Sequence, residues 1–110
     1  MDVEAKLKRE EDILKKVVQI LERRLHPPRI ILFGSRAKGI PFQGNPDFDI
    51  AVDREKVDFW ELIEIEREID AVSGLYKVDI VFLKSVKESF RNIILETGKV
   101  VYEKGSTLCN

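Results

Sequence analysis

The sequence lacks the features that would mark a secreted or membrane-spanning protein. Its 110 residues include a single cysteine, Cys109, which has no partner for an internal disulfide. No apolar run approaches the ~20 residues that a membrane-spanning helix needs, and no signal peptide is evident. The sequence therefore predicts a cytoplasmic protein with no membrane association.

An excess of charge of either sign is also missing. The 19 basic and 20 acidic residues give a formal net charge of −1, whereas proteins that hold nucleic acid normally carry a basic domain or face. A long polynucleotide is therefore disfavoured as a substrate. With 44% hydrophobic and 35% charged residues, we expect one small globular domain over residues 1–110, with a disordered tail from 105 to 110.

Two familiar phosphate-binding motifs are absent as well. Residues 34–39 read GSRAKG and are followed by Ile40 and Pro41. The segment therefore contains neither the Walker pattern GxxxxGK[ST] nor the dinucleotide pattern GxGxxG. A simple P-loop and a dinucleotide site are both excluded.

What the sequence does contain is an apolar strand that stops abruptly at a glycine. The β-branched and aromatic run over residues 30–33 predicts a buried strand. Gly34 then lets the backbone turn without a Cβ penalty, and Ser35 is placed to cap a following helix. Free backbone N–H groups and the side chains of Arg36 and Lys38 would gather at one point, which predicts an anion site.

Acidic and apolar residues alternate in the next predicted strand. Because side chains in a strand repeat every second residue, Asp47 and Asp49 are expected on one face, with Asp53 further along as the cap before the next helix. Neighbouring carboxylates on one face lie about 6 to 7 Å apart at their Cα atoms and repel each other unless a cation lies between them. Since Mg²⁺ takes oxygen ligands, Asp47 and Asp49 predict a magnesium site beside the turn.

A third acid, Asp79, interrupts the apolar strand predicted over residues 76–83. Desolvating a carboxylate there is costly without a partner, which is either a metal or a cation such as Lys77. Asp47, Asp49 and Asp79 together fit two-metal phosphoryl or nucleotidyl transfer. Two Mg²⁺ ions would then hold the triphosphate and lower the pKa of an attacking hydroxyl.

Hydrophobic periodicity predicts the elements around this site. A polar, frayed end over residues 1–9 precedes a helix that stops at His26, which we interpret as a helix cap and not as a catalytic base. A second helix follows with Phe59 packed toward the core and with Trp60 either beside that apolar stripe or exposed, and a third is centred on Phe90, Ile93 and Ile94. The predicted ranges are 56–73 and 86–96 for these two helices and 99–103 for a last strand.

The ordered set of motifs resembles the minimal nucleotidyltransferases of the DNA polymerase β superfamily, whose pattern is GS, then DxD, then a third strand acid. The resemblance covers roughly residues 13–103. It implies an α/β (α+β) fold, a small mixed β-sheet packed with helices as in the polymerase β palm. It also implies that Gly34 and Ser35 bind a nucleoside triphosphate, and that Asp47, Asp49 and Asp79 bind Mg²⁺, with Asp79 assisting the attacking hydroxyl.

Small stand-alone members of this family resemble antitoxins that are paired with a HEPN-family ribonuclease. The resemblance therefore implies an enzyme that transfers AMP from ATP to a tyrosine of such a toxin. From the residues alone, Arg36 and Lys38 are candidates for contact with the nucleotide phosphates, and plain solvation is the alternative for both side chains. The chain departs from the family pattern just before the first acid, where Asn45-Pro46 replaces the common small polar residue. The base preference and the oligomeric state stay open.

Each motif also has a simpler interpretation. Gly34-Ser35 alone is an ordinary strand-to-helix turn, and Asp47 and Asp49 alone are exposed strand residues. Their joint occurrence with Asp79 favours the nucleotide site. Two other functions remain open: an antitoxin that acts only by covering its partner, and a phospho-acceptor receiver domain. The receiver fits less well, because the first strand ends in Gly-Ser and not in an acid pair.

Overall fold

The computed structural model describes residues 3–34, 37 and 47–105. In this part of the chain, helices and strands follow one another in the order and type that the sequence predicts. The helices are α1 (Val3–Leu25), α2 (Phe59–Ser73) and α3 (Glu88–Thr97), with a short 3-10 helix, η2 (Leu83–Ser85). The strands are β1 (Arg29–Phe33), β2 (Phe48–Val52), β3 (Val78–Phe82) and β4 (Lys99–Glu103).

The described strands form one mixed sheet in the order β3-β2-β1-β4. Strand β1 runs antiparallel to both β2 and β4, whereas β2 and β3 are parallel. Parallel neighbours need a long crossover connection, and α2 provides it. The expectation of a small mixed sheet packed with helices is confirmed.

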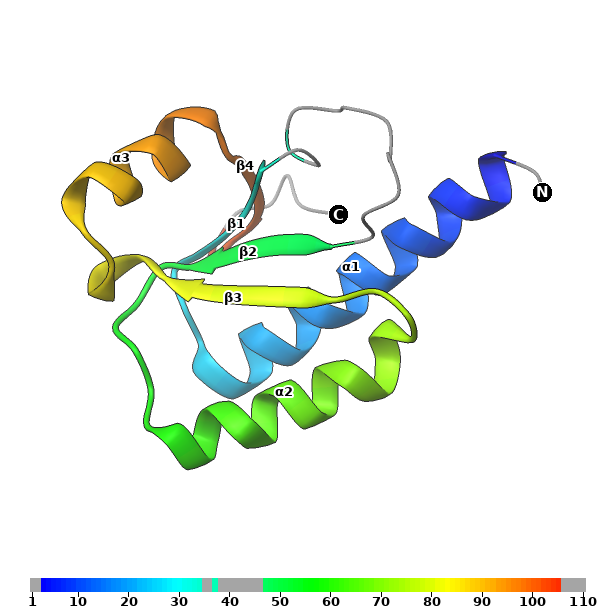
Figure 1. Ribbon diagram of the computed structural model, residues 1–110, viewed down its shortest axis with the longest axis horizontal. Helices are drawn as coiled ribbons and strands as arrows, with labels where there is room; N and C mark the ends of the chain where they lie inside the picture. Colours follow the sequence, from blue (N-terminus) through cyan, green and yellow to red (C-terminus); the bar gives the residue numbers. More distant parts are fainter. Residues whose placement is uncertain (1–2, 35–36, 38–46, 106–110) are drawn as a thin grey trace.

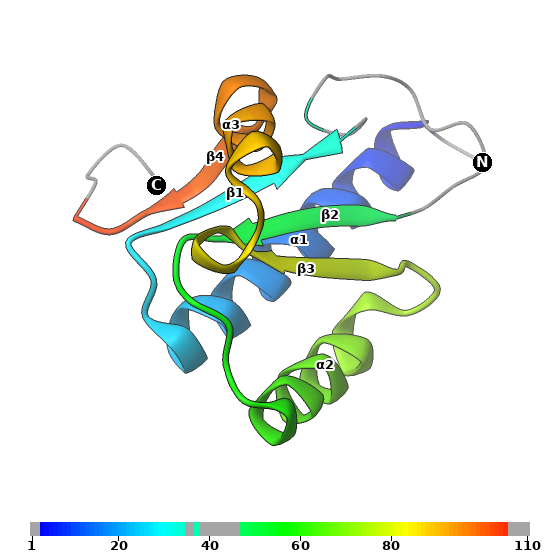
Figure 2. The same ribbon diagram turned by 60° about the vertical axis from the view of Figure 1, so that its left-hand side comes forward.

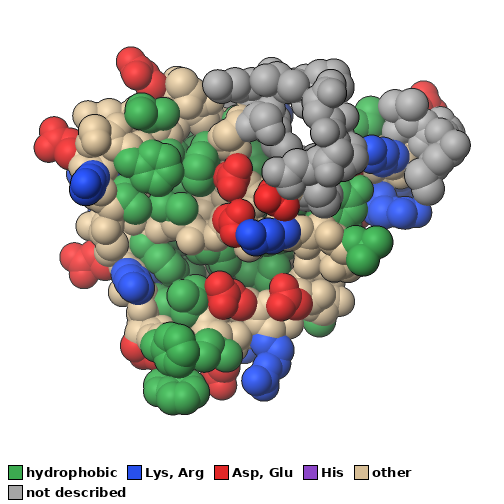
Figure 3. Space-filling view, in the orientation of Figure 1, with side chains coloured by type: hydrophobic (Ala, Val, Ile, Leu, Met, Phe, Trp, Pro, Cys, Tyr) green, Lys and Arg blue, Asp and Glu red, His purple; other side chains and the backbone are tan. Residues whose placement is uncertain are grey.

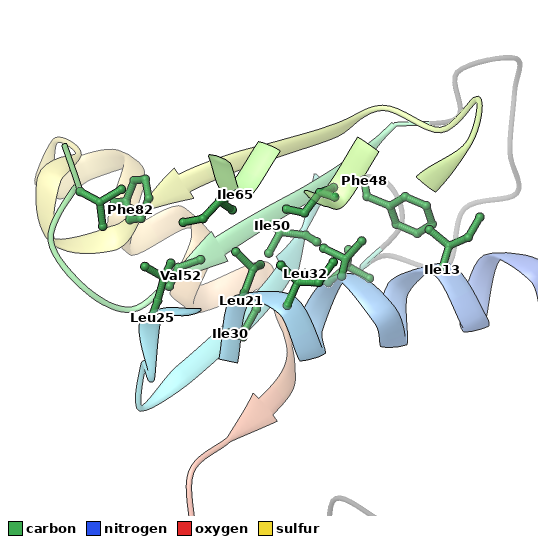
Figure 4. Packing of buried hydrophobic residues seen from close by; sticks show 14 residues of the cluster. Ile13, Leu21, Leu25, Ile30, Leu32, Phe48, Ile50, Val52, Ile65 and Phe82 are labelled. Carbon is green, nitrogen blue, oxygen red and sulfur yellow. The ribbon is translucent and has the colours of Figure 1, made fainter. Parts of the chain in front are cut away.

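Helices cover the two faces of the sheet unequally (Figures 1 and 2). Helices α1 and α2 lie side by side across one face, while α3 lies over the other face, where it contacts β1. The main core fills the space between the sheet and α1 and α2 (Figure 4). It includes Leu21 and Leu25 from α1, Ile30 and Leu32 from β1, Phe48, Ile50 and Val52 from β2, Ile65 from α2 and Phe82 from β3.

Alternation along β2 decides which face carries the acids. Phe48, Ile50 and Val52 are buried in the main core, so the residues between them point to the α3 side of the sheet. There Ala51 packs in a second cluster with Ile31, Leu83 and Ile94. Asp49 shares this side but lies at the other end of the strand, where it remains partly exposed.

Helix α1 is longer than the sequence analysis predicts. It begins at Val3, so the expectation of a frayed end is wrong for residues 3–9. The helix continues because its first half also packs against the molecule: Glu10 is buried and its carboxylate accepts a hydrogen bond of 2.9 Å from the Tyr76 hydroxyl. At the other end the backbone N–H of His26 donates to the carbonyl of Glu22.

The start of α2 also differs from the prediction. Asp58 is the N-cap, and its carboxylate accepts a hydrogen bond of 2.9 Å from the Glu61 backbone N–H, so the helix begins three residues later than Lys56. Asp53, the expected cap, instead accepts a hydrogen bond of 3.2 Å from the side chain of Arg29. The acid that directly precedes the helix is thus its N-cap.

Several aromatic and apolar side chains expected in the core are exposed. Phe59, which the sequence analysis places in the core, is 64% exposed, whereas Val57, just before the cap, is buried there. Trp60 is 74% exposed, which is one of its two expected positions. In α3 only Ile94 is buried, whereas Phe90 and Ile93 reach solvent. No helix in the described ranges is long and apolar enough to cross a membrane.

Candidate active site

Two of the predicted acids are neighbours in the sheet. In the parallel pairing of β2 with β3, Asp49 lies opposite Asp79. Paired residues of adjacent strands point to the same face, and adjacent strands are about 4.8 Å apart. The structure therefore brings both carboxylates together on the side of the sheet that α3 only partly covers. Figure 3 shows acidic side chains gathered beside a basic one on this face.

Asp47 immediately precedes β2 and is close enough for its charge to act on Asp49. It is partly exposed and does not belong to the strand, contrary to the prediction that the strand includes it. Among the described residues, no group of three or more His, Cys, Asp or Glu side chains is already arranged to hold a metal ion. The acids are neighbours, but they are not closed around a common centre.

Asp79 is less enclosed than its apolar sequence surroundings suggest. Its side chain is 45% exposed, because β3 is an edge strand of the sheet and Val78, Ile80 and Phe82 face the main core instead. The carboxylate Oδ1 lies 3.8 Å from Nζ of Lys77. Of the partners predicted for this acid, the nearby cation is the one that the structure contains.

Burial raises the pKa of the Asp49 carboxyl above its ordinary value of 3.8, and the negative charges of Asp79 and Asp47 raise it further. The ammonium group of Lys77 acts in the opposite direction on the same pKa. The site thus concentrates negative charge that one lysine only partly balances. Such a cluster favours the binding of a further cation.

Gly34 lies against this acidic pair. Its φ is +76°, a conformation that side-chain-bearing residues rarely adopt, and its neighbour Phe33 is paired with Asp49 across the sheet. A Cβ atom at residue 34 would be 2.6 Å from Oδ2 of Asp49. Glycine is therefore needed here both for the turn and for the close approach of the carboxylate.

The carbonyl of Gly34 accepts a hydrogen bond of 3.2 Å from the backbone N–H of Ala37. The other predicted nucleotide-binding residues, Ser35, Arg36 and Lys38, lie outside the described residues, as does Pro46. Their expected contacts with a triphosphate are therefore predictions.

Lys77 is a site residue that sequence reasoning treated only as one alternative partner of Asp79. The signal was nevertheless present, because residues two apart in an extended segment share a face. The ring of Phe90 packs edge-on against Phe33 at a centroid distance of 5.9 Å, on the side of the sheet where Asp49 lies. Nothing in the sequence pairs these two aromatic residues, because they are far apart along the chain.

A family model described as "Polymerase beta, Nucleotidyltransferase" matches residues 15–107, which is most of the chain. The chain belongs to this family. The family resemblance drawn from the GS, DxD and third-acid motifs is thus confirmed. The receiver alternative is wrong, since receiver domains have the flavodoxin-like doubly wound parallel sheet, whereas β1 here is antiparallel to both neighbours.

Solved structures with a similar fold include chains of toxin–antitoxin complexes. A chain in the crystal structure of a toxin–antitoxin with AMP-PNP is 26% identical, with a TM-score of 0.67 over 83% of this nucleotidyltransferase and 73% of that chain. A chain in the structure of a tri-AMPylated Shewanella oneidensis HEPN toxin in complex with MNT antitoxin is 22% identical, with a TM-score of 0.65 over 86% and 73% of the two chains.

A third solved structure, assigned as a minimal nucleotidyltransferase, is 24% identical, with a TM-score of 0.64 over 90% of this chain and 95% of that chain. The fold described above is therefore that of known nucleotidyltransferase structures. No curated protein sequence matches the chain.

Proposed function

We propose that this nucleotidyltransferase transfers AMP from ATP, in a Mg²⁺-dependent reaction, to a tyrosine hydroxyl of a HEPN-family toxin and so acts as an antitoxin. The observation that carries the proposal is the position of Asp49 and Asp79, side by side on parallel strands, with Gly34 against the Asp49 carboxylate. In a chain of the polymerase β nucleotidyltransferase family, two neighbouring carboxylates on one face of the sheet support a site for Mg²⁺ and nucleotidyl transfer.

The residues fit magnesium in their chemistry. Carboxylate oxygens are the ligands that Mg²⁺ prefers, and the like charges around Asp49 raise its pKa, so a divalent cation would relieve their repulsion. Asp47, Asp49 and Asp79 would hold it. When bound, the metal would neutralise triphosphate charge and lower the pKa of the acceptor hydroxyl.

The roles of the protein groups follow from their positions. The acceptor oxygen forms a bond to the α-phosphorus of ATP, the bond from that phosphorus to the bridging oxygen breaks, and pyrophosphate leaves. Asp79 is exposed enough to accept the proton of the attacking hydroxyl, and the Lys77 ammonium group lies 3.8 Å from its Oδ1. Gly34 and Ser35, with Arg36 and Lys38, would bind the phosphates through backbone N–H groups and positive charge.

The assignment of AMP and of a HEPN partner is supported by the structural relatives. One similar chain belongs to a toxin–antitoxin crystallised with AMP-PNP, and another belongs to a complex whose HEPN toxin is tri-AMPylated. At sequence identities of 26% and 22%, these relatives suggest which nucleotide and which partner to test. The test itself is made on this chain.

A second function, binding the partner without catalysis, is favoured by one observation. Asp79 already has a cation beside it, since its Oδ1 lies 3.8 Å from Nζ of Lys77. A protein of this kind would keep the fold and the partner surface while making no covalent change.

The two functions are separated by incubating the chain and its copurifying partner with Mg²⁺ and ATP labelled at either the α- or the γ-phosphate. The proposal expects partner label from the α position only, and Asp49→Asn should abolish it, whereas the surface change Asp70→Asn should not. Label from the γ position would contradict nucleotidyl transfer. Absence of label from an intact complex would establish the binding-only function.

A further inference from the structure

A groove of about 790 Å³ lies in the helical layer, away from the acidic face of the sheet. It is bounded by the N-terminal half of α1 and by the end of α2 with the segment that leads into β3 (Figure 1). The proposed transfer reaction uses none of the side chains that line it.

The lining of the groove is apolar at its base and basic at its rim. Ile13, Val72 and Tyr76 contribute apolar surface, and Leu75 stands 96% exposed beside them. An apolar side chain this exposed, in a concave surface rimmed by polar groups, is typical of an interaction site.

The basic rim consists of Lys8, Arg9 and Lys16, against the single carboxylate of Asp12. The groove thus carries a net positive charge in a chain whose formal net charge is −1. This positive charge is confined to the groove. A complementary ligand would therefore carry acidic groups where it contacts the rim and apolar groups where it contacts Leu75.

We propose that this groove binds an acidic amphipathic segment of a partner protein, with apolar side chains on the groove floor and carboxylates at Lys8, Arg9 and Lys16. A helix with apolar residues at three- and four-residue intervals has this chemistry. A nucleic acid strand does not fit as well, because its phosphates would meet Asp12 and leave the apolar floor exposed.

The wall of the groove is linked to the candidate active site. The Tyr76 ring packs against Phe48 at a centroid distance of 5.6 Å, and the carbonyl of the next residue, Lys77, accepts a hydrogen bond of 2.8 Å from the Phe48 N–H. Phe48 lies between Asp47 and Asp49 in the chain. A segment held in the groove would therefore bind beside the strand ends that carry the acids without covering them.

The test uses the full ¹⁵N-labelled chain and a defined probe, a blocked 16-residue helical peptide of leucine, alanine and glutamate. A matched peptide with lysine in place of every glutamate is the control. The acidic peptide should shift the amide signals of Arg9, Gly74 and Leu75, and added salt should weaken its binding. The lysine peptide should leave these signals in place.

Two charge reversals on neighbouring residues of α1 provide the matched variants. Lys16 lines the groove and Lys15 does not, so Lys16→Glu should weaken peptide binding about tenfold, whereas Lys15→Glu should leave it within about twofold. Asp49→Asn should bind the peptide like the wild type. If Asp49→Asn loses AMP transfer but still binds the peptide, the proposed function is supported and the groove is shown to act independently of the acids. If Asp49→Asn keeps AMP transfer, the proposed function fails while the groove inference stands.

Three results would overturn the inference. The first is equal binding of both peptides, or equal loss in both lysine variants. The second is tighter binding of a single-stranded oligonucleotide at the same amides, which would make the groove a nucleic-acid site. The third is a dimer in sedimentation that Lys16→Glu dissociates, which would make a second copy of this chain the occupant.

Discussion

Gly34 and Asp49 meet so closely that a methyl group at residue 34 would overlap the Asp49 carboxylate, 2.6 Å from Oδ2. The two residues come from β1 and β2 and are brought together by the antiparallel pairing of Phe33 with Asp49. The turn and the acid therefore form one unit, and a change in either residue should disturb both.

Gly34→Ala should lower stability and also abolish nucleotidyl transfer. The positive φ alone costs about 1 to 2 kcal/mol for a residue with a Cβ, and the new methyl group would displace Asp49 as well. Gly105→Ala is the matched control, since Gly105 also has a positive φ but no atom within 4 Å of the added Cβ. It should lose stability and keep activity in the labelled-ATP assay. Equal activities in the two variants would contradict this role of Gly34.

Asp49→Asn should stabilise the metal-free protein at neutral pH. Because the folded-state pKa of Asp49 is raised above its ordinary value of 3.8, the native state favours the protonated carboxyl. This contribution is fully present at acid pH and is lost as the pH rises through the folded-state pKa. Thermal unfolding should therefore show similar midpoints for both proteins near about pH 3 and a higher midpoint for the variant near about pH 7.

Magnesium with a non-hydrolysable ATP analogue should give the wild type a higher thermal unfolding midpoint than Asp49→Asn, the reverse of the order expected without ligand. A ligand present at 100 times its Kd stabilises the native state by about 2.7 kcal/mol, and only the protein with intact carboxylates should gain this. Thermal shifts measured with and without EDTA check the expectation. The same shift in wild type, Asp49→Asn and Asp79→Asn would show that these acids do not hold the ion.

Lys77→Met should move the acid side of the pH–activity profile to higher pH. The ammonium group of Lys77 lowers the pKa of Asp49 and lies 3.8 Å from Asp79, so its removal lets the pKa of Asp49 rise further. A higher pH is then needed to remove the proton of this carboxyl group. Lys56→Met, at the other end of β2, removes the same charge far from the acids and should leave the profile unchanged.

Asp58→Ala should cost about 1 kcal/mol of folding free energy, the usual value of a lost N-cap. The Asp58 carboxylate accepts a hydrogen bond of 2.9 Å from the backbone N–H of Glu61, and asparagine at this position can accept the same bond. Denaturant unfolding of the alanine and asparagine variants should therefore differ. If both variants matched the wild type, the cap would contribute nothing.

Local pattern was sufficient to predict the elements and their order. Alternation in β2 predicted Asp49 on the face opposite to Phe48 and Ile50, and the family resemblance predicted a mixed sheet. One error occurred where a local preference had two candidates. Asp53 and Asp58 are both acids before α2, and only the contact of Asp53 with Arg29 shows that it is engaged elsewhere.

The pairing of Asp49 with Asp79 could not be derived from one sequence by periodicity alone. It depends on the register of two parallel strands that a whole helix separates, and periodicity says nothing about register. The exposure of Asp79 depends likewise on β3 being an edge strand, which is a property of the strand order. The positions of Ser35, Arg36 and Lys38 stay predictions.

The pairing of β3 with β2 links correct folding to chemistry. A shift of β3 by one residue would carry Asp79 into the main core and expose Val78 and Ile80, a penalty that the hydrophobic interior alone would enforce. A molecule with β3 in the wrong register should therefore be unstable, whatever its effect on catalysis. Selection for a stable fold would by itself preserve the placement of this carboxylate, even in descendants that had lost the reaction.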